Sequence, residues 1–146
     1  TEILARIVRA FGGPLETLRT APWEYRPHPV WARHDALLRS AIYSADLPWQ
    51  VGTAALTVGI ESLVPTMIEP LFRASVRNYG VSSEDARWLE SRSGEEERQH
   101  GENGYALLAE FVPHGDRTLQ SQCLFYIDQL SASMAYGLLE SGRGAE

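Results

Sequence analysis

The sequence is poor in cysteine, in lysine and in long apolar runs, and each shortage argues against a class of protein. Cys123 is the single cysteine, which excludes an internal disulfide framework and a cysteine-based zinc site. All 13 basic residues are arginine, they form no basic block, and the formal charge is −6, which argues against nucleic-acid and anionic-membrane partners. We expect no membrane-spanning segment and no signal segment. A soluble, cytoplasmic protein is the expectation.

No segment with strand periodicity stands out, whereas apolar residues repeat at helical spacing almost throughout, so the sequence predicts an all-α fold. A length of 146 residues with 44% hydrophobic residues suits one helical domain over 1–146. Residues 21–29 are Pro-rich and predict a connector. The expected helices are 3–11, ended by Gly12; about 29–45; about 48–79, kinked or broken at Pro65 and Pro70 and ended by Gly80; 82–112; and 116–139, capped by Asp116 and followed by a frayed tail at 142–146.

Titratable residues fall on the apolar stripes of three predicted helices. Glu97 and His100 share a stripe with Gly104, so we expect both to point inward, where a carboxylate needs a partner. Glu61 lies in the middle of the stripe of the 48–79 helix, and His34 lies on that of the 29–45 helix. The Glu97-x-x-His100 spacing can chelate one ion from a single helix. Carboxylate and imidazole ligands inside a helical bundle suit non-haem iron or manganese.

Plainer interpretations of the same residues stay open. A single Glu-x-x-His pair arises often by chance on a solvated face, and a single histidine on an apolar stripe is more often a core residue bonded to a carbonyl. Glu61 could instead pair with an arginine. On the opposite face of the 82–112 helix, Arg92 and Glu96 are spaced for an exposed ion pair. We prefer the metal site because three helices each supply a metal-competent side chain.

Three stretches match the order and helix placement of a family's motifs. The first runs from Trp23-Glu24 to Arg33-His34-Asp35, the second contains Gly59-Ile60-Glu61 before Pro65, and the third ends in Glu97-Arg98-Gln99-His100. In these stretches the chain resembles the haem-oxygenase-like di-iron oxidases and oxygenases, the iron-containing redox enzymes related to TenA and PqqC. The resemblance implies that the iron ligands are Glu24, His34, Glu61, Glu97 and His100. Ser93 stands where the family has a histidine, and Glu97 stands where it has an aspartate.

The resemblance also implies a haem-oxygenase-like helical bundle, here shorter than the usual seven helices. Its expected activity is an oxidase or oxygenase that uses one or two Fe(II) ions and O2 to oxidise a small amine-, amino-acid- or fatty-acid-like metabolite. The alternatives are a metal-free, TenA/PqqC-like acid/base enzyme, and a degenerate scaffold or partner subunit marked by Ser93. A ferritin-like di-iron protein is disfavoured because the chain has one Glu-x-x-His. A homodimer is expected from the short chain. The expected walls of the substrate pocket are Trp31, Phe72, Phe111, Phe125, Tyr126 and Met134.

Overall fold

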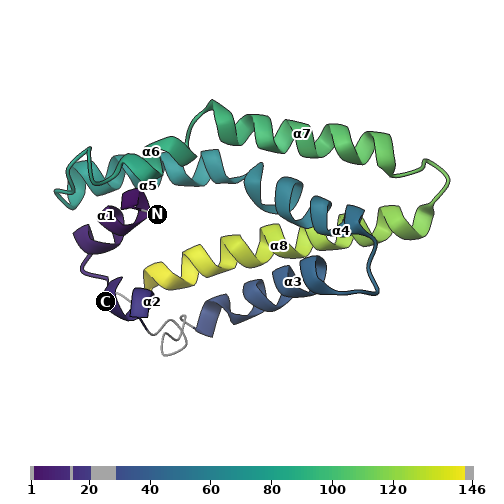
Figure 1. Cartoon of the computed structure of the whole chain (residues 1–146), viewed down its shortest axis with the longest axis horizontal. Helices are drawn as coiled ribbons and strands as arrows, with labels where there is room; N and C mark the ends of the chain where they lie inside the picture. Colours follow the sequence, from purple (N-terminus) through teal and green to yellow (C-terminus); the bar gives the residue numbers. More distant parts are fainter. Residues whose placement is uncertain (1, 14, 21–28, 144–146) are drawn as a thin grey trace. The chain divides into compact units, whose positions relative to one another are not determined.

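The computed structural model describes residues 2–13, 15–20 and 29–143, and every regular element within these ranges is a helix (Figure 1). The predicted all-α fold is therefore confirmed. Besides the α-helices, the described residues form one 3-10 helix, η2, and one π-helix, η3. In chain order the elements are α1 (Glu2–Ala10), α2 (Leu15–Thr20), η2 (Pro29–Trp31), α3 (Ala32–Tyr43), α4 (Trp49–Thr53), η3 (Ala54–Glu61), α5 (Val64–Asn78), α6 (Arg87–Arg92), α7 (Glu95–Phe111) and α8 (Arg117–Arg143).

The chain divides into two compact units, and each unit is built from two separate stretches of sequence. The first unit takes Thr1–Arg26 and Val64–Glu97, and the second takes Pro27–Leu63 and Arg98–Glu146. The expected single domain over 1–146 stays a prediction, as does the haem-oxygenase-like arrangement of the helices. The predicted connector at 21–29 lies outside the described residues except for Pro29, which begins η2.

In the first unit, α5 and α6 pack around a small apolar core, and α1 joins them. The Arg6 guanidinium of α1 forms an ion pair with Glu84, and the Phe11 ring meets the Tyr79 ring edge-on with centroids 6.2 Å apart. These contacts connect the middle of α1 and the residue after its end to the connection between α5 and α6. The residues of the core are Val81, Ala86 and Leu89, with Ile68, Phe72, Val76 and Trp88 packed against them.

The end of α5 follows the sequence prediction closely. Gly80 has φ +67°, and the Val81 N–H donates to the Ser75 carbonyl at 3.1 Å. This bond joins residues six positions apart across the end of α5, where the residue at positive φ is usually glycine because a Cβ is strained there. Gly12 also has positive φ, +68°, and it follows α1 as predicted.

In the second unit, α8 lies between α3 and the continuous α4–η3 segment. Val51 of α4 is buried in one cluster with Leu119 and Cys123 of α8. Further along, the Ser131 hydroxyl donates to the Gly59 carbonyl at 3.1 Å. Residue numbers therefore rise together in the two segments, which run parallel. α3 runs the other way along α8, because its later residue Ser40 contacts Tyr126 and its earlier residue His34 contacts Ser133.

α7 packs against η3 through glycines. A Cβ on Gly101 would lie 3.0 Å from the Ser62 Cβ, and a Cβ on Gly104 would lie only 2.1 Å from the Thr57 Oγ1. At the far end of the helix, the Gln50 side chain donates to the Phe111 carbonyl at 3.2 Å. The two helices therefore run antiparallel, with their backbones close enough that only glycine fits at these positions.

Two of the expected long helices are interrupted. The predicted 82–112 helix is wrong as a continuous element: α6 ends at Arg92 and α7 begins at Glu95. Ser93 and Gly94 are poor helix formers, and the run of acidic residues that follows favours a new helix start because of the helix dipole. The predicted break ahead of Pro65 is confirmed, since η3 ends at Glu61 and α5 begins at Val64, whereas Pro70 lies inside α5.

The start of α8 is capped as predicted, and its end lies further along than expected. The Asp116 carboxylate accepts a hydrogen bond from the Leu119 N–H at 2.9 Å. The helix continues beyond the expected Leu139 to Arg143, so the predicted frayed tail is wrong for residues 142–143. Residues 144–146 lie outside the described part of the chain.

Within the described residues, one helical stretch, Trp49–Asn78, is long and apolar enough to cross a membrane by length and composition. This corrects the expectation that every apolar run is too short. The finding is weak evidence for a membrane, because a core helix of a globular protein meets the same criterion. The stretch is also interrupted between η3 and α5.

Candidate functional site

His34 of α3 is held by α8 through Ser133. Its Nδ1 lies 3.0 Å from the Ser133 Oγ, and the buried Ser133 hydroxyl is 2.9 Å from the Leu130 carbonyl oxygen. In the tautomer in which the hydroxyl donates to that carbonyl and Nδ1 donates to Oγ, the lone pair is on Nε2. Burial lowers the pKa of His34, which outweighs the opposing effects of the Leu130 carbonyl and Asp35. The imidazole is therefore neutral at pH 7.

The aromatic neighbour of His34 fixes the plane of its ring. Trp31 meets the imidazole edge-on, with centroids 5.7 Å apart and planes at 89°. Trp31 in turn covers Gly137 of α8, where an added Cβ would lie 2.8 Å from the indole. The sequence analysis missed Ser133 and Gly137, although both interrupt the apolar stripe of α8 that contains Leu130. A small or hydroxyl residue on a buried stripe is the signal that would have found them.

Glu61 ends the π-helix η3 and is half-buried. The Ser62 N–H donates to the Thr57 carbonyl at 3.0 Å, which is the i to i−5 spacing of a π-helix. π-Helical turns inside α-helices occur frequently at functional sites, because the extra residue redirects the side chains that follow. No sequence signal predicted this π-helix.

Three of the predicted ligands, His34, Glu61 and His100, lie at the same height along the helix axes of the second unit, which we call one level. Ser62, next to Glu61, lies against Gly101, which is next to His100. Ser131 bonds to η3 at Gly59, two residues before the end of η3, and His34 bonds to α8 at Ser133, two residues after Ser131. The residues at this level are His34 of α3, Glu61 of η3, His100 of α7 and Ser133 of α8. In the described part of the chain, however, no three His, Cys, Asp or Glu side chains gather into a group that could hold a metal ion.

The orientation of His100 differs from the prediction. His100 is exposed, and the buried positions of α7 are instead Glu97, Gly101 and Gly104, followed by the half-buried Leu108. The predicted stripe placed His100 inward because it continued the phase of Ala86 and Leu89 through the break at Gly94. Since α7 starts anew at Glu95, its buried face follows the glycines that contact η3.

Glu97 belongs to the first unit, where it has an arginine partner. It is 3% exposed, which confirms that it points inward, and its carboxylate forms an ion pair with Arg92 of α6. The expected exposed pair of Arg92 with Glu96 is wrong. The break before α7 places the two residues in different helices, so they are not one helical turn apart on a single helix. The Ser93 hydroxyl donates to the Glu90 carbonyl at 2.8 Å. Glu24 lies outside the described residues.

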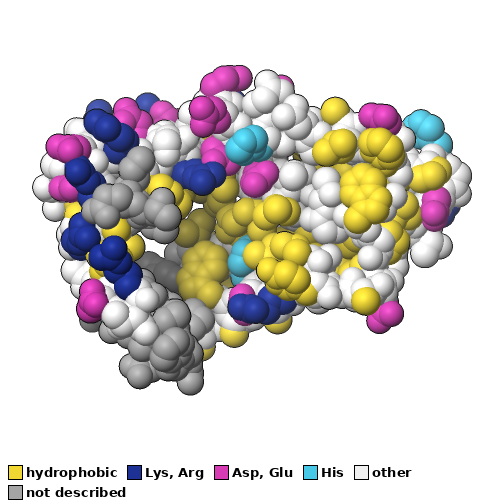
Figure 2. All heavy atoms as spheres, viewed as in Figure 1, with side chains coloured by type: hydrophobic (Ala, Val, Ile, Leu, Met, Phe, Trp, Pro, Cys, Tyr) yellow, Lys and Arg dark blue, Asp and Glu magenta, His cyan; other side chains and the backbone are white. Residues whose placement is uncertain are grey.

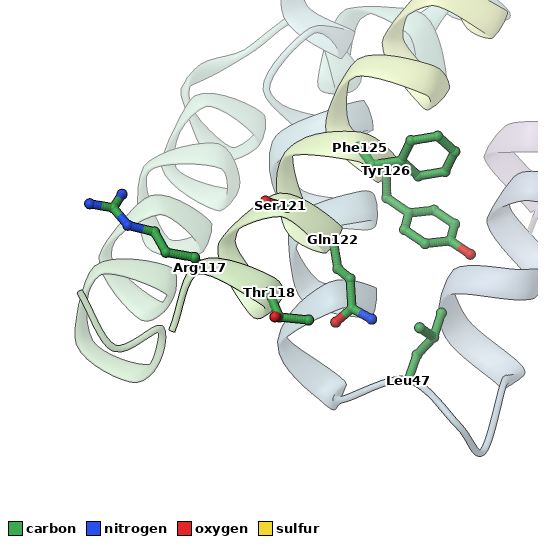
Figure 3. A pocket seen from close by; sticks show the side chains of 7 residues that line it. All are labelled: Leu47, Arg117, Thr118, Ser121, Gln122, Phe125 and Tyr126. Carbon is green, nitrogen blue, oxygen red and sulfur yellow. The ribbon is translucent and has the colours of Figure 1, made fainter. Parts of the chain in front are cut away.

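The second unit also has an open concavity beside the first turns of α8 (Figure 3). Its volume is about 580 Å³. The side chains of Thr118, Gln122 and Tyr126 point toward Leu47, whereas the Arg117 guanidinium points away from them. The Tyr126 hydroxyl lies 3.0 Å from the Ser40 hydroxyl. The lining residues are Leu47, Arg117, Thr118, Ser121, Gln122, Phe125 and Tyr126, so two of the expected pocket walls, Phe125 and Tyr126, line it.

A second groove, of about 360 Å³, lies between α7 and α8. It is mainly apolar and contains Cys123, whose thiol has its pKa raised by burial and is therefore a poor nucleophile. Neither the concavity nor the groove is lined by His34, Glu61 or His100. The groove is lined by Tyr105, Leu108, Ala109, Val112, His114, Gln120, Cys123, Leu124 and Ile127.

Comparisons with protein-family models, with curated proteins and with solved structures found no match.

Proposed function

We propose that this chain is a non-haem iron oxidase or oxygenase with a haem-oxygenase-like helical fold, acting on a small amine-, amino-acid- or fatty-acid-like metabolite. The observation that supports it is the shared level of His34, Glu61 and His100 on three helices of the second unit. Two imidazoles and one carboxylate form the ligand combination that binds Fe(II) and leaves coordination positions open. Bound iron would supply the reduction of O2.

The residues of the chain fit this role in their chemistry. When Nδ1 donates to the Ser133 hydroxyl, Nε2 carries the lone pair that a ligating histidine gives to a metal ion. His100 is exposed and Glu61 is half-buried, so both have room to change rotamer. Such a change is needed, because the side chains are not gathered into a three-ligand group. The resemblance also names Glu24 and Glu97 as ligands, but Glu24 lies outside the described residues and Glu97 is paired with Arg92 in the first unit, so the proposal uses neither.

The test is the iron content of the full chain after anaerobic reconstitution with Fe(II), together with O2 consumption by the loaded protein. We expect at least one iron per chain, lost in His34→Ala and in His100→Ala. His114→Ala is the matched control, since His114 is an exposed turn residue, and it should keep the iron. Absence of bound iron in the wild type, or iron that survives both substitutions, would refute the proposal.

A metal-free acid/base enzyme is the second candidate, and the ion pair between Glu97 and Arg92 favours it. That pair already compensates the most buried of the predicted ligands without a metal ion. In this enzyme the neutral His34 would act as a general base through Nε2. It predicts that the wild type binds no iron and that His34→Ala, but not Glu97→Gln, removes turnover of a bound heterocycle.

A further inference from the structure

The outward face of α8 is apolar along most of the helix. Its central seam consists of residues spaced alternately three and four apart, which is the seam of a coiled coil. The buried face of the same helix, with Leu119, Leu130 and Gly137, lies on the opposite side. We name as the outer α8 face the exposed residues Leu124, Phe125, Asp128, Ala132, Ala135, Tyr136 and Leu139.

The large side chains of the outer α8 face are unusually exposed for a globular protein. Leu124 and Leu139 are 65% and 66% exposed, and Phe125 and Tyr136 are 54% and 56% exposed. Other exposed apolar residues occur elsewhere in the second unit, such as Trp49 and Phe111, whose rings meet edge-on, and hydrophobic side chains are visible over α4 and α7 in Figure 2. The outer α8 face differs because its residues follow one straight seam along one helix.

Phe125 and Leu139 lie seven residues before and after Ala132, and Asp128 and Tyr136 lie four residues before and after it, so these four positions face each other when a second copy is turned end for end. Leu124 and Ala135 have no counterpart on the face. An antiparallel pair centred on Ala132 brings Phe125 opposite the partner's Leu139. It also brings Asp128 opposite the partner's Tyr136, whose hydroxyl can donate to the carboxylate. Self-complementarity of this kind is the property of an isologous, two-fold interface.

The area of the outer α8 face reaches the lower bound for a specific interface. With about 200 Å² for a fully exposed large apolar side chain, the four most exposed residues present about 480 Å² per copy, or about 1,000 Å² for a pair. Stable interfaces bury about 1,200–2,000 Å² in total and a candidate interface should clear about 1,000 Å², so the contributions of Asp128, Ala132 and Ala135 are also needed. Asp128 is the single charged residue on the face. On a chain of net charge −6, a face with one acidic residue meets less repulsion against a second copy than a face with several would.

We propose that two copies of this chain form a symmetric dimer in which the outer α8 faces pair antiparallel, crossing at Ala132. The small side chains at the crossing allow the two helices to approach closely. The pairing is independent of the proposed iron chemistry.

The test is the oligomeric state of the full chain by sedimentation velocity over a concentration series. We expect a wild-type dimer, and Ala132→Arg should raise its dissociation constant at least 100-fold because two guanidinium groups meet at the two-fold axis. Ala106→Arg, at an exposed alanine of α7, is the matched control and should remain dimeric. Unchanged circular dichroism would show that both variants are folded.

A cross-link tests the orientation of the pair. In a Cys123→Ala background, Ala132→Cys should be joined efficiently between copies by a short bis-maleimide, whereas Ala106→Cys should not. A monomeric wild type, a dimer unaffected by Ala132→Arg, or equal cross-linking at both positions would overturn the proposal. Flotation of a monomeric wild type with phospholipid vesicles, lost in Ala132→Arg, would assign the face to a membrane and overturn it equally.

Discussion

The contact between Gly104 and Thr57 allows a sharp test of the packing of α7 on η3. An alanine at position 104 would place its Cβ 2.1 Å from the Thr57 Oγ1 and 2.5 Å from the Thr57 Cβ. Real Cβ contacts are longer than 3.0 Å, so one helix must shift by several tenths of an ångström or more. Both residues belong to the second unit, and the Thr57 hydroxyl is itself bound to the Thr53 carbonyl at 2.7 Å.

Two opposing terms set the magnitude for Gly104→Ala. Replacing glycine by alanine in a helix favours folding by about 1 kcal/mol, and overpacking of a well-packed contact costs about 1–3 kcal/mol, more when backbone must move. Because the Thr57 Cβ lies so close, we place the cost at the upper end and expect a net loss of about 2 kcal/mol. For a chain of this length that loss lowers Tm by about 6 °C.

The assay is urea unfolding followed by circular dichroism, with thermal unfolding beside it. Gly115→Ala is the control, because its Cβ would meet nothing within 4 Å, and its stability should be unchanged. A Thr57→Gly background removes both contacting atoms, so the cost of Gly104→Ala should disappear there. If Gly104→Ala is as stable as the wild type, the helix-propensity term has won and the close approach of α7 to η3 is refuted.

Three further predictions follow from the described contacts. Arg92→Ala should destabilise the chain by about 2 kcal/mol because it removes the ion-pair partner of the buried Glu97 carboxylate, and the Arg92→Ala, Glu97→Ala double variant should recover part of that loss in urea unfolding. Gly80→Ala should cost about 1 kcal/mol because φ is +67°, and an unchanged Tm would contradict the positive φ at the end of α5. Burial lowers the pKa of His34 below 6.5, so as the pH falls the unfolded chain binds a proton at this residue before the folded chain does. The free energy of unfolding should therefore be highest above pH 6.5 and fall below it. A pH series of unfolding measurements should show a smaller fall for His34→Gln.

Local signals predicted the helices and most of their ends. Gly80 and Asp116 acted through the backbone geometry and the capping bond that their residue types favour anywhere, so no tertiary information was needed. The interruption between α6 and α7 was missed because apolar periodicity continues through Ser93 and Gly94. In that segment the low helix propensity of Ser93 and Gly94 and the favourable helix start at the acidic run had a larger effect than the continuing apolar periodicity.

The candidate site was less predictable because it depends on helix phase and on long-range pairing. Glu97 was correctly expected to be buried, but its partner Arg92 is available only because the chain turns between α6 and α7. His100 was placed on the wrong face by the same missed turn. Ser133 was not considered at all, since its role depends on α3 lying against α8, a contact 99 residues apart in sequence.

The contact of Ser62 with Gly101 has a consequence for the architecture of the second unit. These two residues stand beside the points where the chain leaves that unit, after Leu63, and where it returns, at Arg98. The stretch 64–97 is therefore topologically an insertion, with its ends as close together as those of a surface loop. A short glycine-rich linker from Leu63 to Arg98 would close the second unit with little loop entropy. That excision would yield a minimal helical scaffold on which His34, Glu61 and His100 all remain.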